Sequence, residues 1–361
     1  MKYLHIMHNT VFISSYIRLI NENFNLKEHK FLVINGVEEE EIFVLKAKNI
    51  VRYRDKKNSF KILKIIKIFI FLYKNCKNNV ETIYFHSLFD KRIMLFLFIF
   101  RSFLKKSNWI IWGGDLYCYE KRRKGLKYFL WYKIEDYVKR NFTYINTLVP
   151  QDYKIAKKYY KVKGRYKEAV YPEDLNSKIP KQLPLSIKDS TYIQVGNSAD
   201  PTNNHFEILD TLKKFKNENI KIFCILSYGD KEHGKKVNEY GIKNFGDKFI
   251  GIFDFMPIDE YWNYLKDIDI LIFNHRRQQG LGNISMIGYL EKKIYMRDDI
   301  SSWDYLTKNI NLTLNSYENI KYENFETFTQ NNCKGNKEKL QKTYFSKEFY
   351  LKIWEKNFKN N

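Results

Sequence analysis

The sequence predicts an α/β protein made of two similar halves, each built on a parallel sheet flanked by helices. Apolar runs of strand length alternate with amphipathic helical segments from Tyr3 onward, which is typical of parallel strands joined by crossover helices. The same alternation starts again at Ser190. Between the halves, three prolines interrupt a polar stretch without periodicity, which predicts a linker at about residues 172–190.

The length of the chain agrees with two domains. A chain of 361 residues exceeds what one hydrophobic core usually serves. We place an N-terminal domain at residues 1–175 and a C-terminal domain at 176–340. Residues 341–361 are predicted to include a last apolar helix that packs back on the N-terminal domain.

In the first half, short apolar runs are predicted to be strands and the periodic segments between them helices. The strands are predicted at residues 3–7, 31–34, 42–45, 83–87, 109–112 and 143–148. Helices are predicted at residues 14–23 and 92–104 and after Pro150.

Residues 60–74, with the sequence FKILKIIKIFIFLYK, are basic and amphipathic. Lys61, Lys64 and Lys67 fall on one helical stripe, and apolar residues cover the rest. Such a helix either packs on its own sheet with the lysines outward or lies in the interface of an anionic bilayer. The pattern favours packing on the sheet and leaves the bilayer open.

The second half repeats the alternation. Strands are predicted at residues 190–195, 220–226, 249–253 and 268–273, with less regular strands at 301–306 and 312–314. Helices are predicted at residues 204–214, 258–265 and 346–358, and one more from about Asn283.

The stretch at residues 268–290, IDILIFNHRRQQGLGNISMIGYL, is the most informative. A buried strand opens into a polar turn, and a helix follows. Unpaired N–H groups and the positive end of the helix dipole attract anions there. Arg276 and Arg277 add charge, and Gly280 and Gly282 let the backbone approach a phosphate. A surface loop with two solvated arginines is the alternative, because the spacing matches neither the dinucleotide fingerprint nor a Walker loop.

Two further turns follow predicted strands. Gly196-Asn197-Ser198 offers amide and hydroxyl groups suited to a sugar or a diphosphate, although a plain Asx-type turn looks similar. Asp115 follows Gly113-Gly114 at the exit of a strand. A carboxylate there can act as a general base or bind a sugar hydroxyl, and it can equally cap a helix.

Charge and cysteine content limit the class of protein. The formal net charge of +22 indicates an anionic partner, such as a nucleotide, a diphosphate lipid, an anionic bilayer or nucleic acid, or else only AT-rich coding. The four cysteines form no C-x-x-C pair, which argues against a zinc site or a disulfide framework and fits a reduced cytoplasm. No stretch reaches the roughly 18 uncharged apolar residues of a spanning helix, so at most a peripheral membrane protein is expected.

Three motifs occur in an order that resembles glycosyltransferase family 56, the family of TDP-N-acetylfucosamine:lipid II N-acetylfucosaminyltransferase. They are Trp112-Gly113-x-Asp115-Leu116-Tyr117, Gly196-Asn197-Ser198-x-Asp200 and Arg277-Gln278-Gln279-Gly280-x-Gly282. The resemblance implies a GT-B fold, in which two Rossmann-like domains face each other across a cleft. It also implies a transferase that uses no metal ion and no cofactor.

The resemblance implies a substrate pair. The donor would be a dTDP-linked deoxy-amino sugar similar to 4-acetamido-4,6-dideoxygalactose. The acceptor would be an undecaprenyl-diphosphate-linked saccharide at the cytoplasmic side of the bacterial inner membrane, in synthesis of a polysaccharide such as enterobacterial common antigen or O-antigen. The expected partners are therefore a nucleotide sugar, the lipid-linked acceptor and the anionic membrane surface, and not nucleic acid. A GT-B transferase with a UDP- or GDP-linked donor is one alternative, and a basic polyanion-binding protein without catalysis is another.

Site residues follow from the same resemblance. Asp115 is the expected general base, and Arg277 is expected to stabilise the departing nucleoside diphosphate. The expected donor-binding residues lie in the turns of the second half: Gly196, Asn197, Ser198, Tyr228, Arg276, Gln278, Gln279, Gly280, Gly282 and Asn283. The expected acceptor-binding residues follow strands of the first half: His8, Asn9, His86, Trp112, Gly113 and Gly114.

Overall fold

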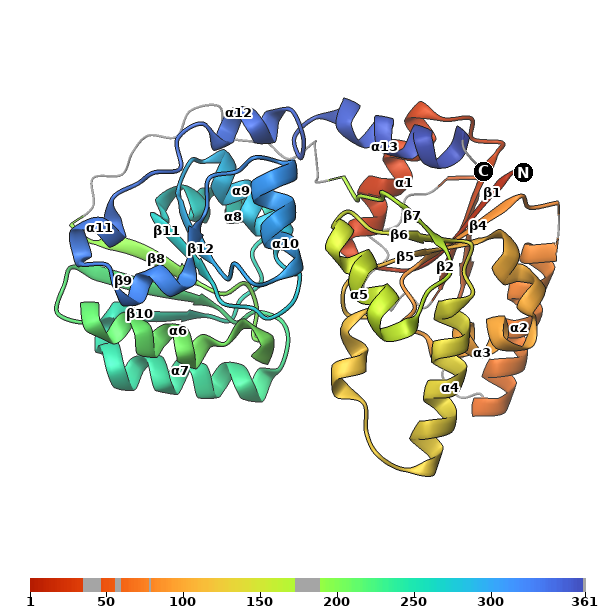
Figure 1. Cartoon of the computed structure of the whole chain (residues 1–361), viewed down its shortest axis with the longest axis horizontal. Helices are drawn as coiled ribbons and strands as arrows, with labels where there is room; N and C mark the ends of the chain where they lie inside the picture. The colour runs from red at the N-terminus through yellow and green to blue at the C-terminus, as the bar shows by residue number, and fades with distance from the viewer. Residues whose placement is uncertain (35–46, 56–59, 78, 173–188, 360–361) are drawn as a thin grey trace. The chain divides into compact units, whose positions relative to one another are not determined.

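The computed structural model describes residues 1–34, 47–55, 60–77, 79–172 and 189–359. The chain forms two compact units (Figure 1): unit 1 is Met1–Glu173 with Lys347–Asn361, and unit 2 is Asp174–Ser346. The domain boundary predicted between residues 175 and 176 and the strand predicted at 42–45 lie outside the described residues. Each unit has a parallel sheet between layers of helices, as the sequence predicts.

Unit 1 contains a seven-stranded sheet in the order β3-β2-β1-β4-β5-β6-β7, and every described pair is parallel. The strands are β1 (Tyr3–His8), β2 (His29–Ile34), β3 (Ile50–Tyr53), β4 (Thr82–His86), β5 (Ser107–Ile110), β6 (Tyr144–Asn146) and β7 (Arg165–Lys167). The strand order reverses between β1 and β4. In open α/β sheets, ligands bind beyond the carboxyl ends of the strands at such a point.

The two faces of this sheet have different cores, because alternate residues of a strand point to opposite sides. Leu4 and Ile6 face a cluster that includes side chains of α2 (Lys61–Lys77), α3 (Lys91–Ile99), α4 (Leu126–Arg140) and α5 (Pro150–Tyr160). Tyr3 and His5 face α1 (Val11–Asn23) and α13 (Lys347–Lys359), where Tyr16 and Phe358 contact them.

The C-terminal helix α13 lies on unit 1 although it follows unit 2 in the chain. Trp354 is fully buried, and its Nε1 donates to the carbonyl of Val170 at 2.9 Å. Asn357 connects it to the strands: its carbonyl accepts from the Tyr84 hydroxyl at 3.1 Å, and its Oδ1 accepts from Asn146 Nδ2 at 2.7 Å. The predicted apolar stripe of this helix is therefore part of the core of unit 1.

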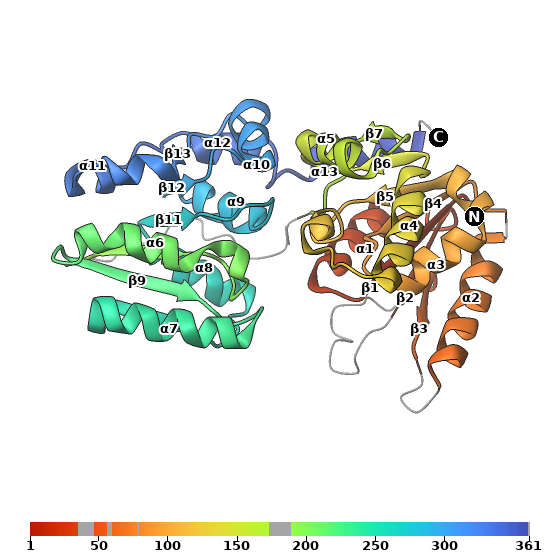
Figure 2. The same ribbon diagram turned by 60° about the horizontal axis from the view of Figure 1, so that its bottom comes forward.

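Unit 2 contains a six-stranded parallel sheet in the order β10-β9-β8-β11-β12-β13. Figure 2 labels β9, β11, β12 and β13 of this sheet. Its strands are β8 (Thr191–Val195), β9 (Ile220–Ile225), β10 (Phe249–Ile252), β11 (Ile270–Phe273), β12 (Lys293–Met296) and β13 (Asn315–Ser316). The helices used below are α6 (His205–Leu212), α7 (Lys231–Phe245), α8 (Ile258–Asp267) and α9 (Leu281–Tyr289). Here the strand order reverses between β8 and β11, which places the turns after these two strands at the switch point.

The last strands predicted for unit 2 are wrong. Residues 301–306 belong to helix α10 (Ser301–Asp304) and a π-helical turn at Tyr305–Asn309, and the sheet instead ends with β12 and β13. The buried residues Tyr305, Leu306 and Ile310 have helical spacing, with no alternation along a pleat. The predicted strand at 312–314 stops just short of β13.

Candidate active site

The turn from β11 into α9 requires a glycine. Gly280 is the N-cap of α9 and has φ +67°, in the left-handed region. A Cβ on Gly280 would lie 2.9 Å from the Phe273 ring and 3.6 Å from Asn197 Cγ. The first intrahelical bond runs from Ile284 N to the Gly280 carbonyl at 3.0 Å. The N–H groups before Ile284 therefore have no acceptor within the helix, and they point out of its positive end.

A second glycine turn lies beside the first. Gly196, after β8, also has φ +67°, and a Cβ there would lie 2.8 Å from His205 Nε2. Two contacts connect the turns: Arg277 Nη2 lies 3.3 Å from Asp200 Oδ2, and Thr202 Oγ1 donates to Gln279 Oε1 at 3.2 Å. Both predicted turns thus form one continuous surface at the switch point of unit 2.

Three arginines lie at this surface, and two of them pair with carboxylates, Arg277 with Asp200 and Arg297 with Asp299. Arg277 is partly exposed and Arg276 is exposed. Arg297, at the end of β12, approaches the same place, because its Nη1 donates to Asn274 Oδ1 at 3.3 Å. Burial, and next the charges of Arg277 and Arg297, lower the pKa of His275 to about 3. His275 is therefore neutral at pH 7, and the arginines supply the positive charge of the turn.

Polar atoms with spare hydrogen-bonding capacity face the same turns. Asn197 Oδ1 and Gln279 Nε2 are buried and have no hydrogen-bond partner among the described residues. Buried polar atoms are usually hydrogen-bonded, so such atoms at a glycine turn are typical of a site that a ligand completes. Gln278 and Gly282 are half-buried at the same turn.

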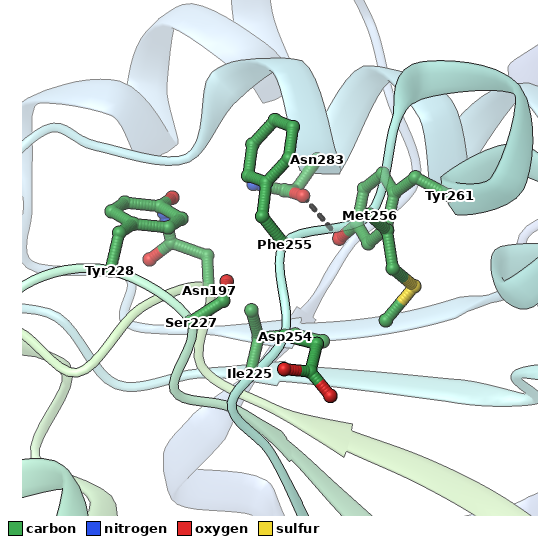
Figure 3. A pocket seen from close by; sticks show the side chains of 9 residues that line it. All are labelled: Asn197, Ile225, Ser227, Tyr228, Asp254, Phe255, Met256, Tyr261 and Asn283. Carbon is green, nitrogen blue, oxygen red and sulfur yellow. Dashed lines mark hydrogen bonds between the residues drawn. The ribbon is translucent and has the colours of Figure 1, made fainter.

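A pocket of about 130 Å³ opens next to the turns, at the carboxyl ends of β8, β9 and β10 (Figure 3). It is lined by Asn197, Ile225, Ser227, Tyr228, Asp254, Phe255, Met256, Tyr261 and Asn283. Asn197, Tyr228 and Asn283 are among the predicted donor residues, and the other six were not predicted. The sequence indicates these six residues only through their position, because they end or follow β9, follow β10 or lie on the next helix, α8.

Hydrogen bonds fix the polar edge of the pocket. Asn197 Nδ2 donates to the Tyr228 hydroxyl at 3.1 Å, and the Tyr261 hydroxyl donates to Asn283 Oδ1 (Figure 3). Burial raises the pKa of Tyr261, which keeps this hydroxyl protonated at neutral pH. Phe255 is 71% exposed at the rim, so its ring is available to contact another planar ring.

Ser198 takes a different place from the one predicted. Its hydroxyl is buried and accepts from Asn203 Nδ2 at 3.2 Å and from the Asp200 N–H at 3.3 Å. Ser198 is absent from the residues that line the pocket. The side chain therefore supports the loop from inside, whereas the neighbouring Asn197 lines the pocket.

In unit 1, Asp115 is buried and its carboxylate is saturated by donors. Its Oδ2 accepts from the Leu88 N–H at 3.0 Å and from Trp109 Nε1 at 2.7 Å, and its Oδ1 accepts from the Trp112 N–H at 2.9 Å. Only 2% of the residue is exposed. A general base must reach the hydroxyl that it deprotonates. This geometry speaks against the predicted catalytic role and instead makes Asp115 the residue that fixes the exits of β4 and β5.

We predict that Asp115→Asn lowers the free energy of unfolding of the protein by about 2–4 kcal/mol, because one amide hydrogen would face a donor and one charge-assisted bond would be lost. Urea denaturation followed by fluorescence measures the change, and Asp210→Asn, at a largely exposed position of unit 2, is the control. An unchanged stability together with lost turnover would restore the general-base role.

The predicted acceptor residues His86 and Trp112 are connected through Tyr171. Trp112 Nε1 donates to the Tyr171 hydroxyl at 2.7 Å, and the same hydroxyl contacts His86 Nδ1. His86 Nε2 lies 3.1 Å from His5 Nδ1, and burial lowers the pKa of His86 to about 3. His86 is therefore neutral, and both of its ring nitrogens have hydrogen-bond partners. This suits a role in positioning Trp112 through Tyr171.

His8 and Asn9 follow β1 directly at the switch point of unit 1. Asn9 is buried and His8 is half-buried. Burial lowers the pKa of His8, and a hydrogen bond to the backbone of Ile34 holds its ring. His8 Nε2 makes no hydrogen bond within the described part of the chain.

Gly113 and Gly114 shape the turn before Asp115. Gly113 has φ +82°, and its carbonyl accepts from the N–H groups of Leu116 and Tyr117. A Cβ on Gly114 would lie 3.0 Å from the Phe89 ring. The positive φ of Gly113 thus requires glycine in the tight turn that follows Trp112, whereas a Cβ on Gly114 would need only a shift of the half-exposed Phe89 ring.

Three further features concern metal ligands, cysteines and membrane-spanning helices. Among the described residues, no group of three or more His, Cys, Asp and Glu side chains is placed to hold a metal ion. The four cysteines are all free thiols. Within the same residues, no helix has the length and apolar character needed to cross a bilayer.

Two parallel Rossmann-like units, with glycine turns at the switch point of the second, are the architecture of the GT-B fold. A glycosyltransferase from Rickettsia africae has this fold with a TM-score of 0.67 at 12% identity, covering 100% of both chains. Sucrose-phosphate synthase from Thermosynechococcus elongatus gives 0.68 at 11% identity, again over 100% of both chains. HepE from Anabaena, solved in complex with UDP, gives 0.67 at 10% identity over 99% of this chain and 100% of its own.

The chain belongs to the family described as 4-alpha-L-fucosyltransferase, glycosyl transferase group 56, which matches residues 6–360. The protein is therefore a glycosyltransferase enzyme, and the family and the GT-B fold predicted from the three motifs are confirmed.

Proposed function

We propose that the protein transfers a deoxy-amino sugar similar to 4-acetamido-4,6-dideoxygalactose from a dTDP-linked donor to an undecaprenyl-diphosphate-linked saccharide. The reaction would take place at the cytoplasmic side of the bacterial inner membrane, in surface polysaccharide synthesis. The family description supports the sugar class, since fucose is also a 6-deoxy sugar of the galactose series. The observation that carries the proposal is the combination of the pocket with the arginine-bearing glycine turns of unit 2.

The pocket and the turns match the two ends of a nucleoside diphosphate. A pocket of about 130 Å³ is smaller than the roughly 300 Å³ or more of a site that encloses a whole ligand, so it would hold one part, the base. Tyr228 and Phe255 offer aromatic faces to that base. The diphosphate would then lie at the start of α9, near Arg277.

The apolar lining favours thymine over uracil. The two bases differ by one methyl group, and Ile225 and Met256 provide apolar surface in the pocket for it. The contact of one methyl group is worth about 0.8 kcal/mol, which is a roughly fourfold difference in affinity. A UDP-linked donor is the second candidate, because HepE, which shares the fold, was solved in complex with UDP.

A thermal-shift titration with dTDP, UDP and GDP tests the donor assignment. We expect dTDP to raise the melting temperature by at least about 4 °C at a hundredfold excess over its Kd, UDP to need higher concentrations, and GDP to have no effect. Stabilisation by UDP alone would contradict the dTDP assignment but keep the nucleotide site. No stabilisation by any of the three would contradict the site itself.

The leaving nucleoside diphosphate gains one negative charge as the glycosidic bond breaks, because the bonding electron pair goes to its terminal phosphate oxygen. Arg277, Arg276 and the N–H groups at the start of α9 are arranged where this charge would develop, and they supply fixed positive potential. We propose that these groups make a metal ion and a cofactor unnecessary. Arg277 would exchange its contact with Asp200 for the phosphate, since both partners are anionic oxygens.

We assign the general base to His8 in place of Asp115. The acceptor hydroxyl must lose a proton as it attacks, and a neutral imidazole with an unpartnered nitrogen can accept it. The lowered pKa keeps His8 neutral at pH 7, and its Nε2, although buried, has no partner among the described residues, in contrast to both oxygens of Asp115. Trp112 and His86, near the same end of the sheet, would position the acceptor sugar.

A further inference from the structure

The outward face of α2 is apolar. Its inward residues Ile68, Leu72 and Cys76 are buried in the core of unit 1, as the periodicity predicts. Ile65, Phe69 and Phe71 are half-buried, whereas the other apolar residues of the helix are exposed, and Ile62 is 71% exposed. The exposed apolar residues at and along this helix are Phe60, Ile62, Leu63, Ile66, Ile70 and Tyr73. Packing on the sheet therefore explains only one side of α2.

A second exposed apolar group lies at the start of α4. Leu126 is 76% exposed, and Phe129 and Leu130 are also exposed. They follow the basic sequence Lys121-Arg122-Arg123-Lys124. Isolated exposed apolar residues are ordinary on a protein surface, but five on one helix, one directly before it and three on another helix form a pattern that indicates a partner.

The two groups belong to one side of unit 1. Helices α2, α3 and α4 lie side by side over the same face of the sheet (Figures 1 and 2). Helix α2 follows β3 and α4 follows β5, so both begin near the carboxyl edge of the sheet. Phe89, which is 51% exposed, directly precedes α3, the helix that contacts both α2 and α4. This is the same edge that carries His8 and Trp112.

The charges around these side chains are mainly positive. Neither residues 60–77 nor residues 121–134 contain an aspartate or a glutamate, whereas both contain several lysines. The acidic groups nearby form ion pairs: Asp90, the N-cap of α3, and Asp55, which precedes α2, pair with Arg92, and Glu135 and Asp136 on α4 pair with Arg122. Two copies of this chain would bring lysines against lysines, which disfavours self-association through this surface.

We propose that the exposed residues of α2 and of the start of α4 form a docking surface for a bilayer that contains anionic lipids. Apolar side chains would enter the boundary between headgroups and acyl chains, and the lysines would contact the lipid phosphates. The benefit for catalysis rests on the proposed function: a membrane-anchored acceptor would meet the carboxyl edge of unit 1, next to His8. The docking itself needs only this surface.

Vesicle co-sedimentation tests the proposal. We expect the full-length protein to bind vesicles of phosphatidylcholine with 30% phosphatidylglycerol, to bind pure phosphatidylcholine vesicles far less, and to lose affinity as salt increases. Ile66→Glu/Ile70→Glu should reduce binding to the anionic vesicles at least tenfold. Ile242→Glu, at an equally exposed apolar position on α7 of unit 2, should leave binding unchanged. The melting temperature of each variant shows whether it is folded.

Each other outcome has a defined meaning. Vesicle binding that is absent, or equal in wild type and the α2 variant, would overturn the proposal. So would a dimer in light scattering that the α2 variant abolishes without any vesicle binding, because the partner would then be a second copy. The dTDP titration is independent of lipid, so a failed nucleotide site and a failed docking surface can be told apart.

Discussion

Arg277→Ala is expected to raise the Kd for dTDP about 10- to 100-fold and to lower kcat about 100- to 1000-fold. A hydrogen bond to a charged group contributes about 1.5–3 kcal/mol to binding, and a group that meets developing charge contributes more in the transition state. Arg277 fits both roles because it borders the glycine turns and contacts a carboxylate that a phosphate can replace. Isothermal titration with dTDP and initial rates measure the two effects.

Two further variants make this result specific. Arg277→Lys keeps the charge and loses the planar fork, so its defects should be intermediate. Lys243→Ala removes an exposed cation on α7 of the same unit and should change neither value. Unchanged dTDP affinity in Arg277→Ala would show that the turn does not bind the diphosphate.

His8→Gln is expected to lower kcat about 100- to 10,000-fold, the usual contribution of a positioned general base, and to leave dTDP affinity unchanged. His8 lies in unit 1 and the nucleotide site in unit 2, so the two measurements are independent. Glutamine preserves the size and hydrogen bonding of the side chain but cannot accept a proton near neutral pH. Added imidazole should restore part of the rate.

The pH dependence of the wild type gives a second test of His8. A general base acts in its neutral form, which dominates above its pKa. Burial lowers the pKa of His8 below 6.5, so kcat/KM should stay constant from pH 8 down to pH 6.5 and fall only at lower pH. A rate that already falls between pH 8 and 7 would be inconsistent with this base, as would normal turnover by His8→Gln.

The sequence predicts most of the two sheets and the glycine turns of unit 2, because both depend on local signals. Apolar runs such as residues 270–273 identify buried strands, and Gly196 and Gly280 occupy backbone conformations with positive φ. Glycine and a following helix are visible in a single sequence. The contact of the two turns is visible only indirectly, through the strand order that places β8 beside β11.

The features that the sequence does not predict depend on contacts between residues that are far apart in the chain. Asp254 and Phe255 line the pocket because β10 is next to β9, and no local pattern reveals that neighbourhood. In the sequence, Asp115 follows a strand and a glycine turn, as a catalytic carboxylate would. Only the structure shows that its carboxylate accepts hydrogen bonds from Leu88, which is distant in the chain, and from Trp109, on the other side of the turn. The amphipathic pattern of residues 60–74 likewise does not reveal how much of its apolar surface the sheet can cover.

Mass spectrometry of the transfer products directly tests the proposed transfer of a deoxy-amino sugar from a dTDP-linked donor. The full-length protein would be incubated with a lipid-diphosphate-linked saccharide and, in parallel, with dTDP-, UDP- and GDP-linked sugars, in the presence of EDTA. We expect the acceptor to gain the mass of one deoxy-amino sugar from the dTDP-linked donor. Transfer that occurs only from another nucleotide sugar, or that EDTA abolishes, would contradict it.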